Sequence, residues 1–170
     1  MSKLVLHFVI SIGLLAVAAC GNKAPAATSG GGQTAQSAAD SAPVDVSDWQ
    51  SWTKISEAPF RSEGHRSQWA DVYVDADHAD AYKAMSGPMP EGTKVAKLIY
   101  KADGDKAGDP AVLTIMVKMA PGYDPEHNDW YYGVYNADGS KAKKHGKIAG
   151  CYECHSNYED TDYVSGVPKE

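Results

Sequence analysis

The segment Cys151-Tyr152-Glu153-Cys154-His155, near the C-terminus, contains the residues with the clearest chemical potential in this sequence. The spacing Cys-x-x-Cys-His is typical of covalent haem attachment. Two cysteines three positions apart on one helical turn can each add to a haem vinyl group, and the adjacent histidine then lies beneath the iron. The motif therefore predicts one covalently bound haem c, with thioethers at Cys151 and Cys154 and with His155 as the proximal ligand of the iron.

Three other kinds of chemistry compete for the same residues. A zinc site needs four ligands, to which His145 could contribute, but the adjacent Cys154 and His155 cannot easily both point at one metal. A thioredoxin-like redox pair normally follows an early strand of a βαβ unit, whereas this pair lies near the end of the chain. A structural disulfide between Cys151 and Cys154 is the third alternative. Haem attachment is favoured because the chain begins with an export signal, and attachment of this type takes place outside the bacterial cytoplasm.

The sequence does not decide whether the sixth coordination position of the iron is filled. Electron carriers fill it with methionine or histidine, and the chain offers both. Methionines in an expected strand are better explained as core residues (Met116, Met119), and histidines among polar neighbours as solvated residues (His78, His145). The candidates that remain open are Met85, Met89, His65 and His127.

The N-terminal residues read as a targeting signal. Lys3 is followed by an apolar stretch that ends at Ala19 and is too short for a comfortable membrane span. The run Val17-Ala18-Ala19-Cys20 resembles a bacterial lipobox, in which the signal is cut before a cysteine that becomes lipidated. We expect residues 1–19 to be a lipoprotein signal peptide and Cys20 to be the anchor; ordinary secretory cleavage that leaves a free thiol is the alternative. The mature protein would be periplasmic and membrane-anchored, and Gly21 after the anchor favours the outer membrane.

The stretch that follows the expected anchor has almost no large apolar residue. Residues 20–47 are mainly Ala, Gly, Ser, Thr, Gln and Pro, a composition typical of a disordered tether. The folded domain is therefore expected over residues 48–170. The formal net charge of −6 becomes −7 once Lys3 leaves with the signal. No basic patch indicates nucleic-acid binding, and the acidic balance is compatible with a basic electron-transfer partner.

Helices are expected at two places before the haem motif. Asp48 followed by Trp49, Trp52 and Ile55 at helical spacing predicts a short capped helix. A second helix is predicted over residues 78–85, with Asp75 or Asp77 as its cap. The cysteine motif itself is expected to open a final helical turn.

Strands are expected in the remainder of the domain. Residues 69–74, 93–101, 112–119 and 130–135 are rich in Val, Ile, Leu and Tyr. Turn residues separate them, including Gly104 and the segment Gly108-Asp109-Pro110. Loops this short favour an antiparallel meander, and the polar residues 140–147 are expected to lead into the cysteine motif.

Five segments stand out by their order along the chain: residues 68–75, 89–97, 117–118, 128–132 and 151–155. This ordered set resembles the cytochrome P-460 family, over roughly Trp49 to Asn157. The resemblance implies an α+β fold, mainly an antiparallel β-sheet with a few short helices and a C-terminal c-type haem motif. It also implies a five-coordinate haem and a possible homodimer. Relatives with the characteristic chromophore oxidise hydroxylamine, alone or with nitric oxide, to nitrous oxide or nitrite.

The resemblance also assigns roles to two residues of the expected strands. The lysine that family members join covalently to the haem corresponds to Lys97, which shares its strand face with Val95 and Ile99; such a lysine is unusual unless its amine is used or snorkels to the surface. The carboxylate that relays protons in active members corresponds to Thr114, which offers no titratable group near neutral pH. The related cytochrome c-prime-beta binds nitric oxide and carbon monoxide beneath a cap of phenylalanines, but Phe60 is the only phenylalanine left after signal removal.

Three functions follow as expectations. The first is hydroxylamine or nitric oxide oxidation and detoxification, a hydroxylamine oxidoreductase-type activity that Thr114 weakens. The second is nitric oxide or carbon monoxide binding without turnover. The third is a periplasmic electron carrier with a filled sixth position. The expected partners are a small nitrogenous ligand, a periplasmic electron-transfer protein and, through the lipid anchor only, the membrane.

Overall fold

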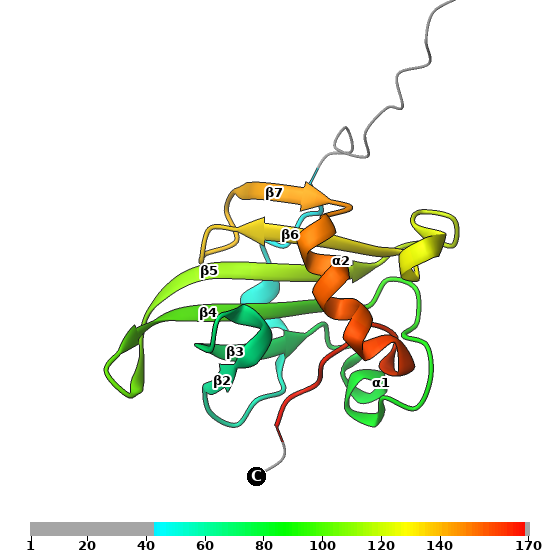
Figure 1. Cartoon of the computed structure of the whole chain (residues 1–170). Coiled ribbons are helices and arrows are strands. Elements are labelled where there is room, and N and C mark those ends of the chain that lie inside the picture. Colours follow the sequence, from blue (N-terminus) through cyan, green and yellow to red (C-terminus); the bar gives the residue numbers. More distant parts are fainter. Residues whose placement is uncertain (1–42, 169–170) are drawn as a thin grey trace, which may run out of the picture. The chain divides into compact units, whose positions relative to one another are not determined.

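The computed structural model describes residues 43–168. The expected signal peptide, Cys20 and most of the expected tether lie outside this range. The described chain forms an α+β fold built on one antiparallel sheet of seven strands (Figure 1). Its strand order is β1-β3-β4-β5-β6-β7, with β2 also paired to β3. The strands are β1 (Thr53–Lys54), β2 (Phe60–Ser62), β3 (Gln68–Val74), β4 (Lys94–Asp103), β5 (Lys106–Lys118), β6 (Trp130–Tyr135) and β7 (Ala142–Gly146).

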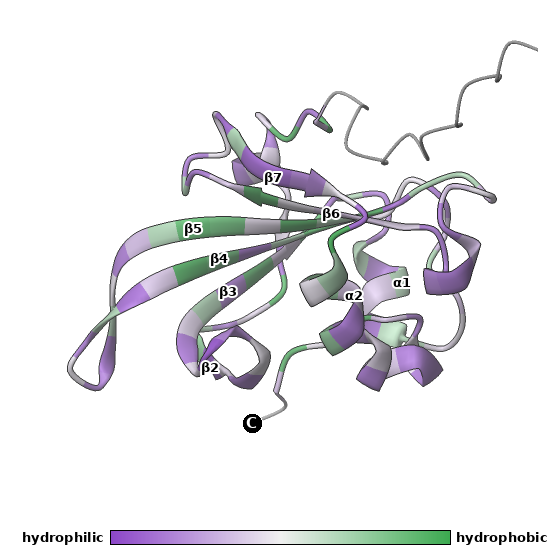
Figure 2. Ribbon diagram, turned by 45° about the horizontal axis from the view of Figure 1, so that its top comes forward, coloured by the Kyte–Doolittle hydropathy of each residue, from purple (hydrophilic) through white to green (hydrophobic). Residues whose placement is uncertain are grey.

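The two faces of the sheet are both buried near its centre. Along β4, Val95 belongs to one hydrophobic cluster, whereas Ala96 and Leu98 belong to the other. This division follows from the strand geometry, because successive side chains point to opposite faces. Figure 2 shows the apolar centre of β4 and β5 and the hydrophilic tip of the hairpin between them.

Short helices cover one face of the sheet. They are α1 (Ala79–Ala84) and α2 (Ala149–His155), and both views place them on the same side (Figures 1 and 2). Tyr82 of α1 and Ile148, just before α2, join the cluster that contains Val95. The 3₁₀ turns are η2 (Trp49–Ser51), η3 (Glu63–His65), η4 (Pro125–His127) and η5 (Ser156–Thr161).

The predicted meander of β3 to β6 is confirmed, and β6 has the expected bounds. The prediction of a capped helix at Asp48 is wrong in extent: only the turn η2 forms, and the Asp48 side chain makes no capping hydrogen bond. Helix α1 is present, but neither expected aspartate caps it. His78 precedes it, and the Asp75 carboxylate instead accepts hydrogen bonds from the His78 ring and from the Lys94 backbone, each at 2.6 Å.

The second half of the sheet differs from the sequence prediction at two places. The segment Gly108-Asp109-Pro110 was expected to be a turn but lies inside β5, because the turn is confined to Gly104 and Asp105. The polar residues before the cysteine motif, where no strand was predicted, contain β7, which pairs with β6.

The first described residues already pack against the sheet. Val46 is 1% exposed and joins the cluster opposite the helices, together with Val44 at its margin. The Tyr135 hydroxyl donates a hydrogen bond to the Val44 carbonyl at 2.8 Å. In residues 43–168, no helix is long and apolar enough to cross a membrane.

Candidate functional site

Helix α2 carries the whole Cys-x-x-Cys-His segment. Its first turn is closed by the Ile148 carbonyl, which accepts hydrogen bonds from the backbone of Cys151 at 2.8 Å and of Tyr152 at 3.2 Å. No residue of this helix is fully buried. Both cysteines are free thiols that are not joined to one another, and Cys154 is exposed. The helix therefore carries two cysteine sulfurs about one turn apart, as thioether formation requires.

The His155 ring is oriented by the chain that follows it. Its Nδ1 lies 2.7 Å from the Tyr163 carbonyl, which has no proton and must therefore accept one from the ring. Nε2 is then the nitrogen with a free lone pair, which is the arrangement found in metal-ligating histidines. Burial lowers the pKa of His155, and the nearby Lys97 contributes to the same shift. A neutral, oriented imidazole of this kind fits the role of an iron ligand.

A cavity of about 480 Å³ opens beside α2. Its walls come from the segment β2-η3, from the middle of the sheet, from α2 and from the residues that follow η5. An inner chamber of about 50 Å³ continues from it toward the core and shares Lys97, Thr114 and His155 with it. Gly64 and Gly150 also border the main cavity and add no side-chain bulk. The sulfurs, His155 and the space beside them fit a haem group.

Lys97 projects its amine into this cavity. The Nζ atom lies 3.4 Å from Ser62 Oγ and 3.3 Å from Ser165 Oγ, so two serines from distant segments hold it. Burial lowers the pKa of Lys97 to about 8. A lysine with this pKa has an appreciable unprotonated fraction near neutral pH, and only the unprotonated amine is a nucleophile. The Phe60 ring also borders the cavity, with its centroid 6.0 Å from Lys97 Nζ.

Thr114 is the direct cross-strand neighbour of Lys97. It lines both the cavity and the inner chamber. Its hydroxyl donates to the Lys97 carbonyl at 3.3 Å, so its one proton is used within the sheet. Among residues 43–168, Glu63 is the only carboxylate that lines the cavity, and it is exposed. No acidic side chain of the same residues lines the inner chamber.

His65 is the second histidine of the cavity. It borders both the main cavity and the inner chamber, and neither ring nitrogen has a hydrogen-bond partner within residues 43–168. Burial, followed by the nearby Lys97 and His155, lowers the pKa of His65 to about 4. The surrounding residues Glu63, Gly64, Arg66 and Ser67 are polar or small, so the sequence left His65 open as a candidate without showing that it enters the site.

Of the other candidates for the sixth iron position, one borders the inner chamber and the rest pack elsewhere. Met116 borders the inner chamber, although it is only 8% exposed and packs in the core. Met89 is also a core residue, and Met85 packs at the margin of the same cluster. Met119 packs at the margin of the opposite cluster. His127 stacks on Tyr152 with a ring separation of 3.7 Å and does not line the cavity.

The expectation that His78 and His145 are solvated is wrong. His78 pairs with Asp75, as described above, and its side chain is 22% exposed. The His145 ring lies 6.2 Å from that of Tyr131, and its Nδ1 is buried with no hydrogen-bond partner in the described chain. Within residues 43–168, no group of three or more histidine, cysteine or acidic side chains is placed to hold a metal ion, which leaves the zinc alternative without a ligand set.

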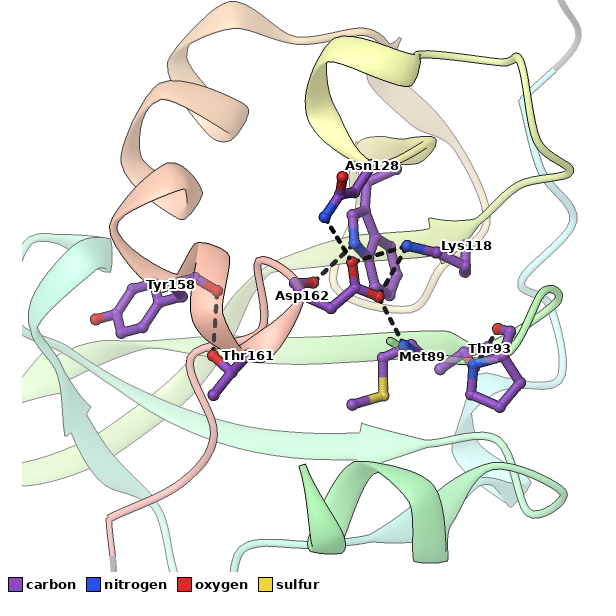
Figure 3. A network of polar contacts seen from close by, with 9 residues as sticks. Met89, Thr93, Lys118, Asn128, Tyr158, Thr161 and Asp162 are labelled. Atoms are coloured by element: carbon purple, nitrogen blue, oxygen red, sulfur yellow. Dashed lines mark hydrogen bonds and ion pairs between the residues drawn. The ribbon is translucent and has the colours of Figure 1, made fainter. Parts of the chain in front are cut away.

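A buried polar network holds the chain after α2 in place (Figure 3). Both carboxylate oxygens of Asp162 lie 2.8 Å from Lys118 Nζ. The same carboxylate accepts a hydrogen bond from the Met89 backbone at 2.7 Å and from the Asn128 amide at 3.1 Å. The Trp130 indole donates to the Asp162 carbonyl at 2.8 Å. Tyr163, whose carbonyl orients His155, is the next residue, so this network anchors the support of His155.

Comparison with known proteins supports a specific family. No curated protein matches the chain. A family model described as Cytochrome P460 matches residues 46–165, which is more than half of the chain and includes every cavity residue discussed above. That family implies a haem cofactor with its iron. The chain belongs to the cytochrome P460 family.

Proposed function

We propose that the protein is a mono-haem c-type cytochrome that acts on small nitrogen species, with hydroxylamine or nitric oxide as its ligand or substrate. The observation that carries this proposal is the single cavity that gathers Cys151, Cys154 and His155 with Lys97 and Thr114. Cys151 and Cys154 would form the two thioethers, and His155 Nε2 would bind the iron. When bound, the haem supplies an iron that accepts a small ligand and exchanges electrons with it.

Other residues in and around the cavity would orient His155, hold the Lys97 amine and contact the ligand. Tyr163 orients His155 through its carbonyl, and burial favours the neutral ring by lowering the pKa of His155. Ser62 and Ser165 hold the Lys97 amine inside the cavity, where its lowered pKa suits covalent attachment to the cofactor. Phe60 and Val134 contribute apolar side chains to the wall around them. Thr114 offers oxygen lone pairs beside the amine but no group that takes up a proton at neutral pH.

Hydroxylamine oxidation releases protons that the site must remove. Two molecules of hydroxylamine yield one nitrous oxide and one water, and they release four protons and four electrons. The electrons would pass to a periplasmic electron-transfer protein, for which a basic partner would suit the acidic chain. The protons need an acceptor close to the substrate, and a positioned base contributes about 10²–10⁴-fold to such a step. Because Thr114 replaces that base, we expect tight ligand binding with slow oxidation.

Thr114 also favours a second candidate, the binding of nitric oxide or carbon monoxide without turnover. In that case the protein would scavenge or sense the gas. The third candidate, an electron carrier, requires a side chain on the iron opposite His155, for which the cavity offers His65 and Met116.

Two measurements on the exported protein test the proposal. Haem should survive acid-acetone extraction, and the double variant Cys151→Ala, Cys154→Ala should lose all covalently bound haem. Ferrous protein should bind carbon monoxide immediately if the site is open. Zinc in place of haem would reject the proposal, and a ferrous protein that does not bind carbon monoxide would be an electron carrier.

The location of the protein is part of the same proposal. We infer a periplasmic domain that is tied to the bacterial membrane only by lipidated Cys20, with the outer membrane favoured. Residues 1–19 would be removed as the signal peptide, residues 20–47 would form the tether and residues 48–170 the haem domain. A homodimer fits the family, and no nucleic-acid partner is proposed.

A further inference from the structure

We propose that His65 donates a hydrogen bond to the small ligand held on the face of the haem site opposite His155. This inference deepens the proposed function and rests on it. It assigns the recognition of a polar nitrogen ligand to a residue outside the haem-binding motif and outside the strand pair that carries Lys97 and Thr114.

The position of His65 is the first observation. His155 enters the cavity from α2, whereas His65 enters it from η3, between β2 and β3. These are separate walls of one space, and the inner chamber touches both rings. The η3 segment also lies close to the haem-binding sulfurs, because a Cβ atom added at Gly64 would be 3.6 Å from Cys154 Sγ. His65 is therefore placed beside the cofactor position and not at a distant part of the cavity.

The segment that carries His65 is held in a defined conformation. β2 pairs with β3 through Ser62 and Gln68. The Arg61 guanidinium donates to the Ser67 carbonyl at 3.0 Å and lies 4.5 Å from the centroid of the Trp69 ring. These contacts close the turn on both sides of His65, so the ring is presented by a braced loop.

The hydrogen-bonding state of His65 is the second observation. A neutral imidazole carries one N–H donor and one acceptor. This ring makes no hydrogen bond within residues 43–168, and its nitrogens are not among the fully buried atoms, so they are open to the cavity that His65 lines. The ring can supply the donor that a bound nitrogen or oxygen atom requires.

The other polar groups of the cavity are already engaged or differently placed. The Lys97 amine is held by Ser62 and Ser165. The Thr114 hydroxyl donates to the Lys97 carbonyl. The Tyr132 hydroxyl has no partner within residues 43–168 but is fully buried, and Tyr132 borders only the inner chamber, with its ring 5.5 Å from that of His155. Among the same residues, His65 is the histidine other than His155 that borders both the cavity and the inner chamber.

The test uses haem-loaded, full-length protein with carbon monoxide and hydroxylamine as probes. The infrared stretching frequency of carbon monoxide on the ferrous protein reports a donor beside the ligand, because a hydrogen bond to the oxygen lowers it. His65→Ala should raise this frequency and weaken hydroxylamine binding to the ferric protein by about two- to tenfold, the range of one net hydrogen bond. His65→Gln, which retains an N–H donor, should recover part of both effects. His78→Ala, a histidine outside the cavity, should change neither.

Each alternative outcome has a definite meaning. Unchanged carbon monoxide frequency and hydroxylamine affinity in both His65 variants would overturn the inference while leaving the proposed function intact. A low-spin ferric spectrum in the wild type that becomes high-spin in His65→Ala would also overturn it, because His65 would then bind the iron itself. A wild type without haem would instead reject the proposed function.

Discussion

The Asp162 network gives the sharpest prediction about stability. Asp162→Ala removes the carboxylate that pairs with Lys118 and accepts hydrogen bonds from Met89 and Asn128. The Asp162 side chain is 4% exposed and that of Lys118 is 13% exposed, so water can hardly replace the lost partner. The Trp130 bond to the Asp162 carbonyl is a backbone contact and can persist.

The expected loss of unfolding free energy follows because Asp162→Ala leaves the Lys118 ammonium buried without a partner. Removal of one partner of a buried ion pair costs about 3–5 kcal/mol. Domains of this kind unfold with a free energy of about 5–15 kcal/mol, so the variant should lose a large part of its stability. Adding Lys118→Met removes the stranded charge, and the double variant should recover about 1–2 kcal/mol relative to Asp162→Ala. The effect of the two substitutions is therefore not additive.

Urea unfolding of the haem-loaded protein measures these free energies, with tryptophan fluorescence and the haem absorption followed together. Asp160→Ala is the matched control, because Asp160 is exposed and lies in the same turn η5. It should unfold at the same urea concentration as the wild type. If Asp162→Ala were as stable as Asp160→Ala, the carboxylate would not be a buried partner of Lys118, and the support assigned to His155 would lose its basis.

Three other predictions concern the site and the anchor. Thr114→Glu should raise the rate of hydroxylamine oxidation at least tenfold at unchanged haem content, because a positioned base contributes ~10²–10⁴-fold. Thr114→Gln has no titratable group and should give no gain in rate. Equal rates in the two variants would contradict the role of a base. The Lys97 pKa of about 8 lies below its ordinary 10.5, so the unfolded chain binds more protons between these values, and stability should rise with pH through that window if the amine is free. Lys97→Met should flatten this rise, and a wild type that is already flat and yields a haem peptide containing Lys97 would show that the amine is bonded to the cofactor. Cys20→Ser should move the protein from the membrane fraction to the soluble periplasmic fraction, and equal partition of the two forms would argue against lipidation.

The central strands were predictable because their residues are apolar on both faces. β4 to β6 combine β-branched and aromatic residues with short turns, which is the strongest local signal for strands. β7 was missed because its lysines lack that pattern. It is the last strand of the sheet, and lysines at a sheet edge oppose pairing with another chain.

The misplaced turn in β5 has a similar physical cause. Proline lacks an N–H donor, so Pro110 was expected to end a strand. However, β6 pairs with β5 only from Leu113 onward, and Pro110 faces β4 alone, next to an irregularity in the register. The missing donor is therefore tolerated, because no strand lies on its other side.

Some site residues can be recognised from their spacing in the sequence, whereas others come together only through folding. Cys151, Cys154 and His155 are recognisable because their chemistry depends on spacing within one helical turn. His65 is not, because its neighbours read as a polar surface loop and its burial arises only when η3 packs beside α2 and the sheet. Ser62 and Ser165 were missed for the same reason, since they meet at Lys97 from segments far apart in the chain.

The residues that would hold the haem are separate from those that would meet a ligand, so substitutions in the second group can change the reaction alone. In the proposed haem protein, covalent attachment and the iron ligand His155 depend on α2 and on the Asp162 network, whose residues do not line the cavity. The opposite wall is assembled from η3, β4 and β5, so a substitution at His65 or Thr114 alters the groups that meet a ligand without removing a thioether or the iron ligand. Binding and turnover can therefore diverge through these two positions while the haem remains in place. Under the proposed function, Thr114 supplies no base and His65 supplies a donor, a combination that would favour holding a nitrogen ligand over oxidising it.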